Sequence, residues 1–249
     1  LSAGGGAFSL PERKEYALPE TGSQPKRSGG FSGGTTACGI RISVEKRIFA
    51  VRPLTCGARR TMKESWKPGT MIYPLPAVMV SCGSEPSEYN IITVAWVGTI
   101  CTNPPMCYIS VRPERHSYPI LKKNMEFVIN LTTRSLAYAT DWCGVNSGKD
   151  HTKFEEMKLT PGKASVVNAP IIEECPLCIE CRVKEVMALG SHDMFIADVV
   201  NVQADDKYLD PKTGAFDMQR ADLLAYSHGK YYGLGDFVGK FGWSVRKKK

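Results

Sequence analysis

The segment from Asn90 to Tyr118, NIITVAWVGTICTNPPMCYISVRPERHSY, carries the residue types best suited to hold a ligand. Uncharged hydrogen-bonding side chains are concentrated in its first half, at Asn90, Thr93, Thr99 and Thr102. Trp96 adds a flat apolar surface, and the second half ends in Arg112, Arg115 and Ser117, which are suited to binding an anion. The segment therefore predicts a site for an aromatic ligand that carries a phosphate.

Two strands must position these side chains. Val, Ile, Thr and Trp favour strands, and Pro104-Pro105 interrupts them because proline has no N–H to give to a ladder. We expect strands at 72–82, 90–100, 106–112, 127–131, 177–189 and 194–203, helices at 118–124 and 136–142, and a short strand within 40–51. No strand–helix–strand rhythm is present, so the pattern predicts a mainly β protein with short helices, built as a closed or split antiparallel barrel.

Seven blocks of this sequence, in order, resemble the flavin reductase-like proteins, and most closely their flavoredoxin branch. They are N-x-x-T-x-A-W-x-G-T with N-P-P, I-S-x-R-P-x-R and F-V-I-N-L; Ser147 to Asp150; Lys153-Phe154; Glu173 to Pro176; Glu180-Cys181; Ser191 to Asp193; and Gly239 to Gly242. The resemblance spans about Met62 to Arg246. It implies an FMN-binding split barrel, a Greek-key-like antiparallel barrel that dimerises.

The resemblance also implies site residues. It places Trp96 beside FMN, although a strand tryptophan is more often a core residue. The flavin contacts carried over are Asn90, Cys101, Ser117, Lys153 and His192, with Tyr226 as a weaker candidate, Thr93 as a polar neighbour, and Val97, Gly98 and Thr99 as backbone donors. Ser117 is equally natural as a helix N-cap, Lys153 and Arg112 as surface residues, and His192 as a hydrogen-bonded loop residue.

The function implied is that of an FMN-dependent oxidoreductase, with NAD(P)H or a redox protein as electron donor. The chemistry would take place on flavin N5, so no catalytic side chain is expected. A non-enzymatic FMN electron carrier or binding module is the alternative. We expect a homodimer with FMN near the subunit interface, because a split barrel of this size leaves an open flank on which the cofactor needs a second wall.

The run Cys175-x-x-Cys178-x-x-Cys181 resembles part of an iron–sulfur motif, but Lys184 stands where the fourth cysteine is needed. On a strand these three residues do not share a face, so no metal site is expected. Nine cysteines, an odd number in a chain of 249 residues with an ordinary core, favour reduced thiols and a cytoplasmic protein.

The net charge of +7 lies almost entirely in the first 61 residues, which hold ten Lys and Arg against four Glu. The remainder holds 22 basic and 21 acidic residues, so the expected domain at 62–249 has no electrostatic footprint for nucleic acid. Residues 1–61 are rich in glycine and lack hydrophobic periodicity, and we expect them to be a disordered or non-native extension without a role in function. No apolar run long enough to span a membrane is present, so we expect no membrane partner.

Overall fold

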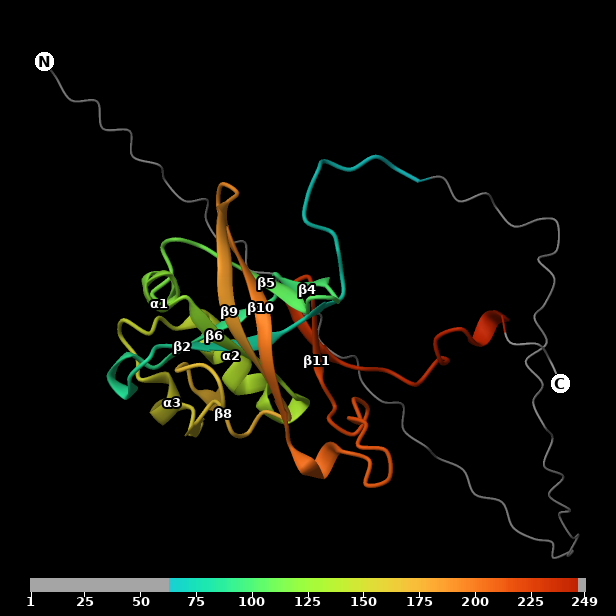
Figure 1. Cartoon of the computed structure of the whole chain (residues 1–249). Helices are drawn as coiled ribbons and strands as arrows, with labels where there is room; N and C mark the ends of the chain where they lie inside the picture. Colours follow the sequence, from blue (N-terminus) through green and yellow to red (C-terminus); the bar gives the residue numbers. More distant parts are fainter. Residues whose placement is uncertain (1–62, 246–249) are drawn as a thin grey trace, which may run out of the picture. The chain divides into compact units, whose positions relative to one another are not determined.

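The computed structural model describes residues 63–245. Its main element is a seven-stranded antiparallel sheet with the order β3-β2-β6-β9-β10-β5-β4 (Figure 1). The bounds are β2 Val78–Cys82, β3 Asn90–Val94, β4 Val97–Cys101, β5 Met106–Val111, β6 Glu126–Leu131, β9 Leu177–Ala188 and β10 Asp193–Ala204. The mainly β architecture predicted from the sequence is confirmed.

The sheet is curled because its two edge strands are consecutive in the chain. Only Ala95 and Trp96 separate the end of β3 from the start of β4, yet five other strands lie between these two in the sheet. The two edges must therefore approach each other at Trp96, and the Ser110 N–H donates to the Trp96 carbonyl there (2.9 Å). The predicted strand at 90–100 is thus two strands that meet at the corner where the barrel is split.

Alternate residues of the central strands face two separate hydrophobic cores. The inner core lies within the curl and contains Val80, Phe127 and Phe195, while the outer core contains Met79 and Val128. Since neighbouring residues of a strand point to opposite faces, both faces of β2 and β6 are buried. That double burial explains why these strands are apolar runs rather than alternating patterns.

Three short helices lie beside the sheet, and two of them complete the outer core. They are α1 Ser117–Asn124, α2 Ala137–Val145 and α3 Lys153–Glu156. Cys143 of α2 and Phe154 of α3 are buried in the outer core. The predicted helix at 118–124 is confirmed, and its chain reverses at Met125, whose φ of 53° is left-handed. The helix predicted at 136–142 starts with a 3-10 turn at Arg134–Leu136 and extends to Val145.

The remaining strands are short. β7 Pro161–Gly162 pairs with β8 Ile171–Ile172, and β1 Leu75–Pro76, β11 Leu224–Ser227 and β12 Lys230–Gly233 form a three-stranded sheet. The predicted strand at 72–82 is divided between β1 and β2, and each joins a different sheet. Further 3-10 turns lie at Pro86–Glu88, Asp206–Tyr208 and Trp243–Val245. The predicted strand within 40–51 and the predicted boundary at residue 62 lie outside the described residues.

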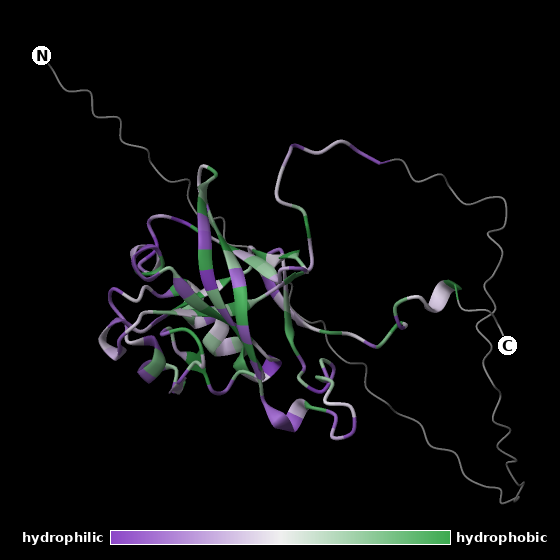
Figure 2. Cartoon of the chain, in the orientation of Figure 1, coloured by the Kyte–Doolittle hydropathy of each residue, from purple (hydrophilic) through white to green (hydrophobic). Residues whose placement is uncertain are grey.

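The long β9–β10 hairpin matches the two strands predicted at 177–189 and 194–203. Hydrophilic and hydrophobic residues alternate along it in Figure 2. Cys178 lies in the outer core and Cys181 in the inner core, so these two thiols of the cysteine run point to opposite faces of the sheet. None of the helices in the described part of the chain has the length and hydropathy that a membrane span requires.

Candidate functional site

Two neighbouring cavities lie at the split of the barrel and share four lining residues, so we treat them as one groove. We call it the flavin groove after the ligand that the sequence predicts for it. One, about 370 Å³, is lined by Thr93, Trp96, His192 and Tyr226. The other, about 320 Å³, is lined by Asn90, Ser117, Cys143 and Lys153. Both are bordered by Ile92, Arg112, Arg115 and Gly144. The groove therefore has one aromatic end and one end rich in hydrogen-bond donors.

The aromatic end is built by the corner at Trp96 and by the β11–β12 hairpin. The Trp96 and His192 rings are stacked, with centroids 6.0 Å apart and an interplanar angle of 12°. Tyr226 of β11 meets Tyr231 of β12 at 5.8 Å, and the Tyr231 hydroxyl donates to Asp141 (3.1 Å). These rings form apolar walls with polar edges, an arrangement suited to a planar ligand that also needs hydrogen bonds.

The surroundings of His192 disfavour the charged form of its imidazole. Partial burial lowers the pKa of its imidazole, and the positive charges of Arg112 and Arg115 lower it further, while Glu114 opposes them. Its Nδ1 lies 2.9 Å from the Ser191 hydroxyl, which helps fix the ring against Trp96. The neutral imidazole that these surroundings favour can offer a ligand one N–H or one lone pair.

The donor-rich end is organised around Lys153, whose side chain is only 5% exposed. Its Nζ donates to the carbonyl oxygens of Ile91 (2.8 Å) and Cys143 (2.7 Å), which ties α3 to β3 and α2. Burial lowers the pKa of this ammonium group, and the positive charge of Arg115 lowers it further. An ammonium has three N–H donors, so one is left to reach an anion in the groove.

Asn90 and Ser117 complete this end. Asn90 starts β3, and its Nδ2 donates to the Ser117 hydroxyl at the first turn of α1 (2.8 Å). The helix N-cap is His116, so the alternative interpretation of Ser117 as the N-cap is wrong. Gly148 lies so close that a Cβ atom there would sit 2.2 Å from the Asn90 Oδ1. The glycine is needed for the 146–148 loop to close over the amide.

Four of the predicted residues do not line either cavity. Val97 is buried in the inner core, Gly98 faces the Tyr108 ring, Thr99 is exposed and Cys101 is half-buried at the end of β4. β4 is an edge strand and pairs only with β5 among the described residues, so its second edge is available to a ligand or a second chain. That the residues from Val97 to Thr99 supply backbone donors to the flavin stays a prediction.

Sequence reasoning missed other parts of the groove, namely Tyr231, Asp141, Gly144 and the loop at 146–148. The pair His228-Gly229 before Lys230 is a turn signal that could have revealed the β11–β12 hairpin and with it Tyr231. The described part of the chain contains no group of three or more His, Cys, Asp or Glu side chains placed to hold a metal ion.

Known proteins resemble this chain in sequence and in fold. The family model for the flavin reductase like domain matches residues 70–235, so the chain belongs to that family. The fold is similar to flavoredoxin of Desulfovibrio vulgaris (Miyazaki F), with a TM-score of 0.69, 28% identity, and coverage of 74% of this chain and 100% of the other. A Shewanella frigidimarina protein described as having a flavin reductase split barrel domain gives a TM-score of 0.61 at 25% identity, covering 68% of this chain and 86% of that one.

A more distant sequence relative carries a named activity. The FMN reductase (NADH) RutF 2 of Rhizobium rhizogenes is 25% identical over 44% of this chain and 61% of its own length. The family match and the similar solved structures confirm the fold predicted from the sequence, a split barrel of the flavin reductase-like family.

Proposed function

We propose that the chain binds FMN in the flavin groove and acts as an FMN-dependent oxidoreductase with NAD(P)H as electron donor. The observation that carries the proposal is the adjacency of two cavities, one lined by the rings of Trp96 and Tyr226 and the other by the buried ammonium of Lys153. A phosphorylated flavin has the same polarity, an aromatic ring system at one end and a dianion at the other. Bound FMN would supply hydride and electron chemistry at its ring nitrogen N5.

The protein's own contribution is binding and orientation. Lys153, Asn90 and Ser117 would hold the phosphate or ribityl chain, and Arg112 and Arg115 would add positive charge beside it. Trp96, His192 and Tyr226 would confine the ring system, while Thr93 packs against the groove with its hydroxyl donating to the Thr140 carbonyl. Cys143 stays a neutral thiol there, because burial raises its pKa to about 11.

A non-enzymatic FMN carrier is the second candidate, favoured by the fold similarity to flavoredoxin. A steady-state assay of NADH and NADPH oxidation with FMN present separates the two. Continuous turnover supports the oxidoreductase. A single stoichiometric reduction, or none, supports the carrier.

His192→Ala should affect riboflavin and FMN equally, because His192 lies at the aromatic end of the groove. The loss of one neutral hydrogen bond, about 0.5–1.5 kcal/mol, should weaken both ligands a few-fold. If that bond favours the reduced flavin, the reduction potential should fall by about 10–30 mV for a two-electron couple. His192→Gln keeps an N–H donor and should retain most of both properties. A change in affinity confined to FMN would show that His192 does not contact the ring system.

We also propose a homodimer that completes the flavin groove. Trp96, just before β4, is 36% exposed and Ile100 of β4 is 47% exposed, so a second chain at the unpaired edge of β4 can cover both. Sedimentation equilibrium should give twice the 27.4 kDa chain mass. A monomer with full FMN affinity would contradict this proposal, because its flavin would have one wall open to water.

A further inference from the structure

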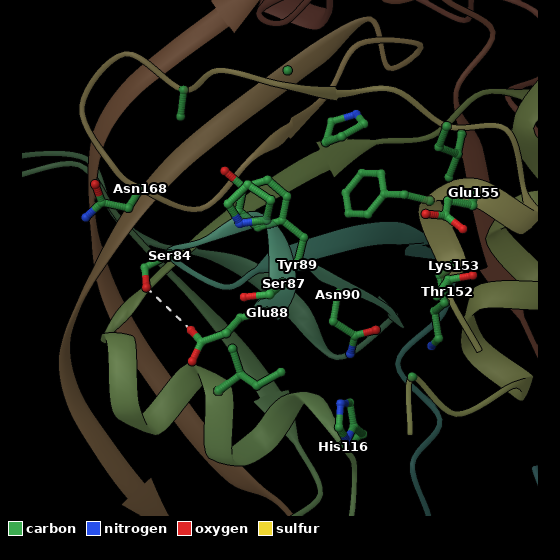
Figure 3. A pocket seen from close by; sticks show the side chains of 18 of the residues that line it. Ser84, Ser87, Glu88, Tyr89, Asn90, His116, Thr152, Lys153, Glu155 and Asn168 are labelled. Atoms are coloured by element: carbon green, nitrogen blue, oxygen red, sulfur yellow. Dashed lines mark hydrogen bonds between the residues drawn. The ribbon is translucent and has the colours of Figure 1, made fainter. Parts of the chain in front are cut away.

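One loop carries both arginines of the flavin groove. It consists of residues 112–116 between β5 and α1, and we call it the anion loop. Arg112 and Arg115 line both cavities of the groove, and His116 lines the donor-rich end. Figure 3 shows His116 and Asn90 at the border with a larger neighbouring cavity, of about 1180 Å³. All five residues of the loop are exposed, so burial in a core does not hold the loop in place.

Asp193 holds both ends of the anion loop. The backbone of Asp193, at the start of β10, pairs with Val111, the residue before the loop. Its Oδ2 accepts a hydrogen bond from the hydroxyl of Tyr118, which lies two residues after the loop (2.5 Å). Between these two points the Arg115 N–H donates to the Arg112 carbonyl (3.0 Å), and the Tyr118 N–H donates to the Arg115 carbonyl (2.9 Å). The segment 111–118 is therefore closed into a ring by a single residue of β10.

The hydrogen bond from Tyr118 to Asp193 is not needed to attach α1 to the sheet. Leu121 of the same helix is fully buried in the inner core, and the Tyr118 ring packs edge-on against Phe195 with centroids 5.7 Å apart. The bond to Asp193 raises the pKa of the Tyr118 phenol, so the hydroxyl keeps its proton and remains a donor. Since Asp193 directly follows His192, this bond also links the anion loop to the aromatic end of the groove.

We propose that Tyr118 and Asp193 are positioning residues for the phosphate of the bound flavin, because their hydrogen bond keeps the anion loop closed beside the groove. This inference rests on the proposed flavin site. Neither side chain lines the two cavities of the groove, so both act through Arg112 and Arg115. A loop that is already closed binds the phosphate without a further loss of conformational entropy. The effect is specific for a phosphorylated flavin, since riboflavin has no phosphate to meet the loop.

Tyr118→Phe tests the role of the hydroxyl, because phenylalanine keeps the ring against Phe195 and removes only the donor. The full chain is titrated with FMN and with riboflavin, and flavin fluorescence is followed. FMN affinity should fall about two- to tenfold, the range for loss of one hydrogen bond, and riboflavin affinity should not change. Asp193→Asn keeps an oxygen that can accept from the hydroxyl and should retain most of the preference for FMN.

Tyr138→Phe is the matched control and should leave both affinities unchanged, since Tyr138 is 75% exposed and lines none of the cavities. A double-variant cycle separates positioning from a general loss of stability. When Arg112 and Arg115 are both replaced by alanine, the loop has no charge left to position. In that background Tyr118→Phe should cause no further loss of FMN affinity.

An unchanged ratio of FMN to riboflavin affinity in Tyr118→Phe would overturn this inference and leave the flavin site intact. The same conclusion follows if Tyr118→Phe weakens FMN equally in the presence and absence of the two arginines. Failure of the wild-type chain to bind either flavin would overturn the proposed function and this inference together.

Discussion

Lys153→Ala is expected to weaken FMN binding about 10- to 150-fold while changing riboflavin binding little. A charge-assisted hydrogen bond to a phosphate contributes roughly 1.5–3 kcal/mol, and riboflavin has no phosphate to lose. Two N–H groups of the Lys153 ammonium donate to carbonyl oxygens, so the third is the one that can donate to the phosphate. Titration of both ligands, followed by flavin fluorescence, measures the difference directly.

The same substitution removes the donor to two buried carbonyls, so thermal stability must be followed in parallel. Lys153→Gln is the second variant, since its amide can still donate to a carbonyl but carries no charge. Lys149→Ala is the control for a general loss of positive charge, because Lys149 is exposed on the adjacent loop and lines none of the described cavities. Equal losses of FMN and riboflavin affinity in the Lys153 variants would show that Lys153 does not bind the phosphate.

Glu180→Gln should produce the largest loss of stability among single carboxylate substitutions. Glu180 of β9 is fully buried and accepts hydrogen bonds from three backbone N–H groups of the 163–168 loop, those of Ser165, Val166 and Val167. The Glu180 carboxylate also accepts hydrogen bonds from Asn201 Nδ2 (2.7 Å) and Gln203 Nε2 (2.9 Å). The NH2 group of a glutamine at this position would face N–H donors and leave some of them without an acceptor. Leaving such buried groups unsatisfied costs about 2–4 kcal/mol, which for a domain of this size lowers the Tm by roughly 5–15 °C. Differential scanning calorimetry checks the shift.

The pH dependence of stability gives an independent readout of Glu180. Burial alone would raise the pKa of this carboxyl, but the Ser165 N–H, the two side-chain amides and the Val166 N–H together lower it to about 2. Since the folded pKa lies below the unfolded value, the contribution of about 3 kcal/mol is present above pH 4.5 and is lost as the pH falls toward 2. Glu180→Gln should flatten the acid limb of the stability curve.

Glu174→Gln is the matched control for both experiments. Glu174 is an exposed carboxylate that accepts from the Thr160 N–H (3.0 Å) and the Thr160 hydroxyl (2.7 Å), so it makes similar bonds in water. Its replacement should cost less than about 1 kcal/mol. If the two variants melt at the same temperature, the buried carboxylate does not hold the 163–168 loop as described.

The sequence predicts the central strands well because their residues are unambiguous. The runs at Phe127 to Leu131 and Met106 to Val111 are apolar and β-branched, and both are strands. The corner at Trp96 was not predicted, because Ala95 and Trp96 fit a continuing strand. The strand is divided there only because β3 and β4 pair with different neighbours in the sheet. Hydrophobic periodicity predicts that a segment is a strand, but it does not predict which neighbours that strand pairs with in the sheet.

The sequence named several residues that the structure brings together, but it did not predict how they are arranged. The motif resemblance pointed to Asn90, Ser117 and Lys153, and the structure brings all three to one cavity. That Lys153 is almost fully buried could not be inferred, because lysine is almost never buried unless partners hold it, and the partners here are backbone carbonyls of distant residues. The burial of Glu180 was missed for a similar reason, because its hydrogen-bond partners lie on other segments of the chain.

An FMN titration of the purified protein, followed by absorbance between 350 and 500 nm as roughly the range of the oxidised flavin bands, tests the central claim most directly. The account predicts saturable binding, with sharpened flavin bands as the ring system leaves water for the walls formed by Trp96, His192 and Tyr226. A protein that is colourless as purified and leaves the spectrum of added FMN unchanged would contradict it.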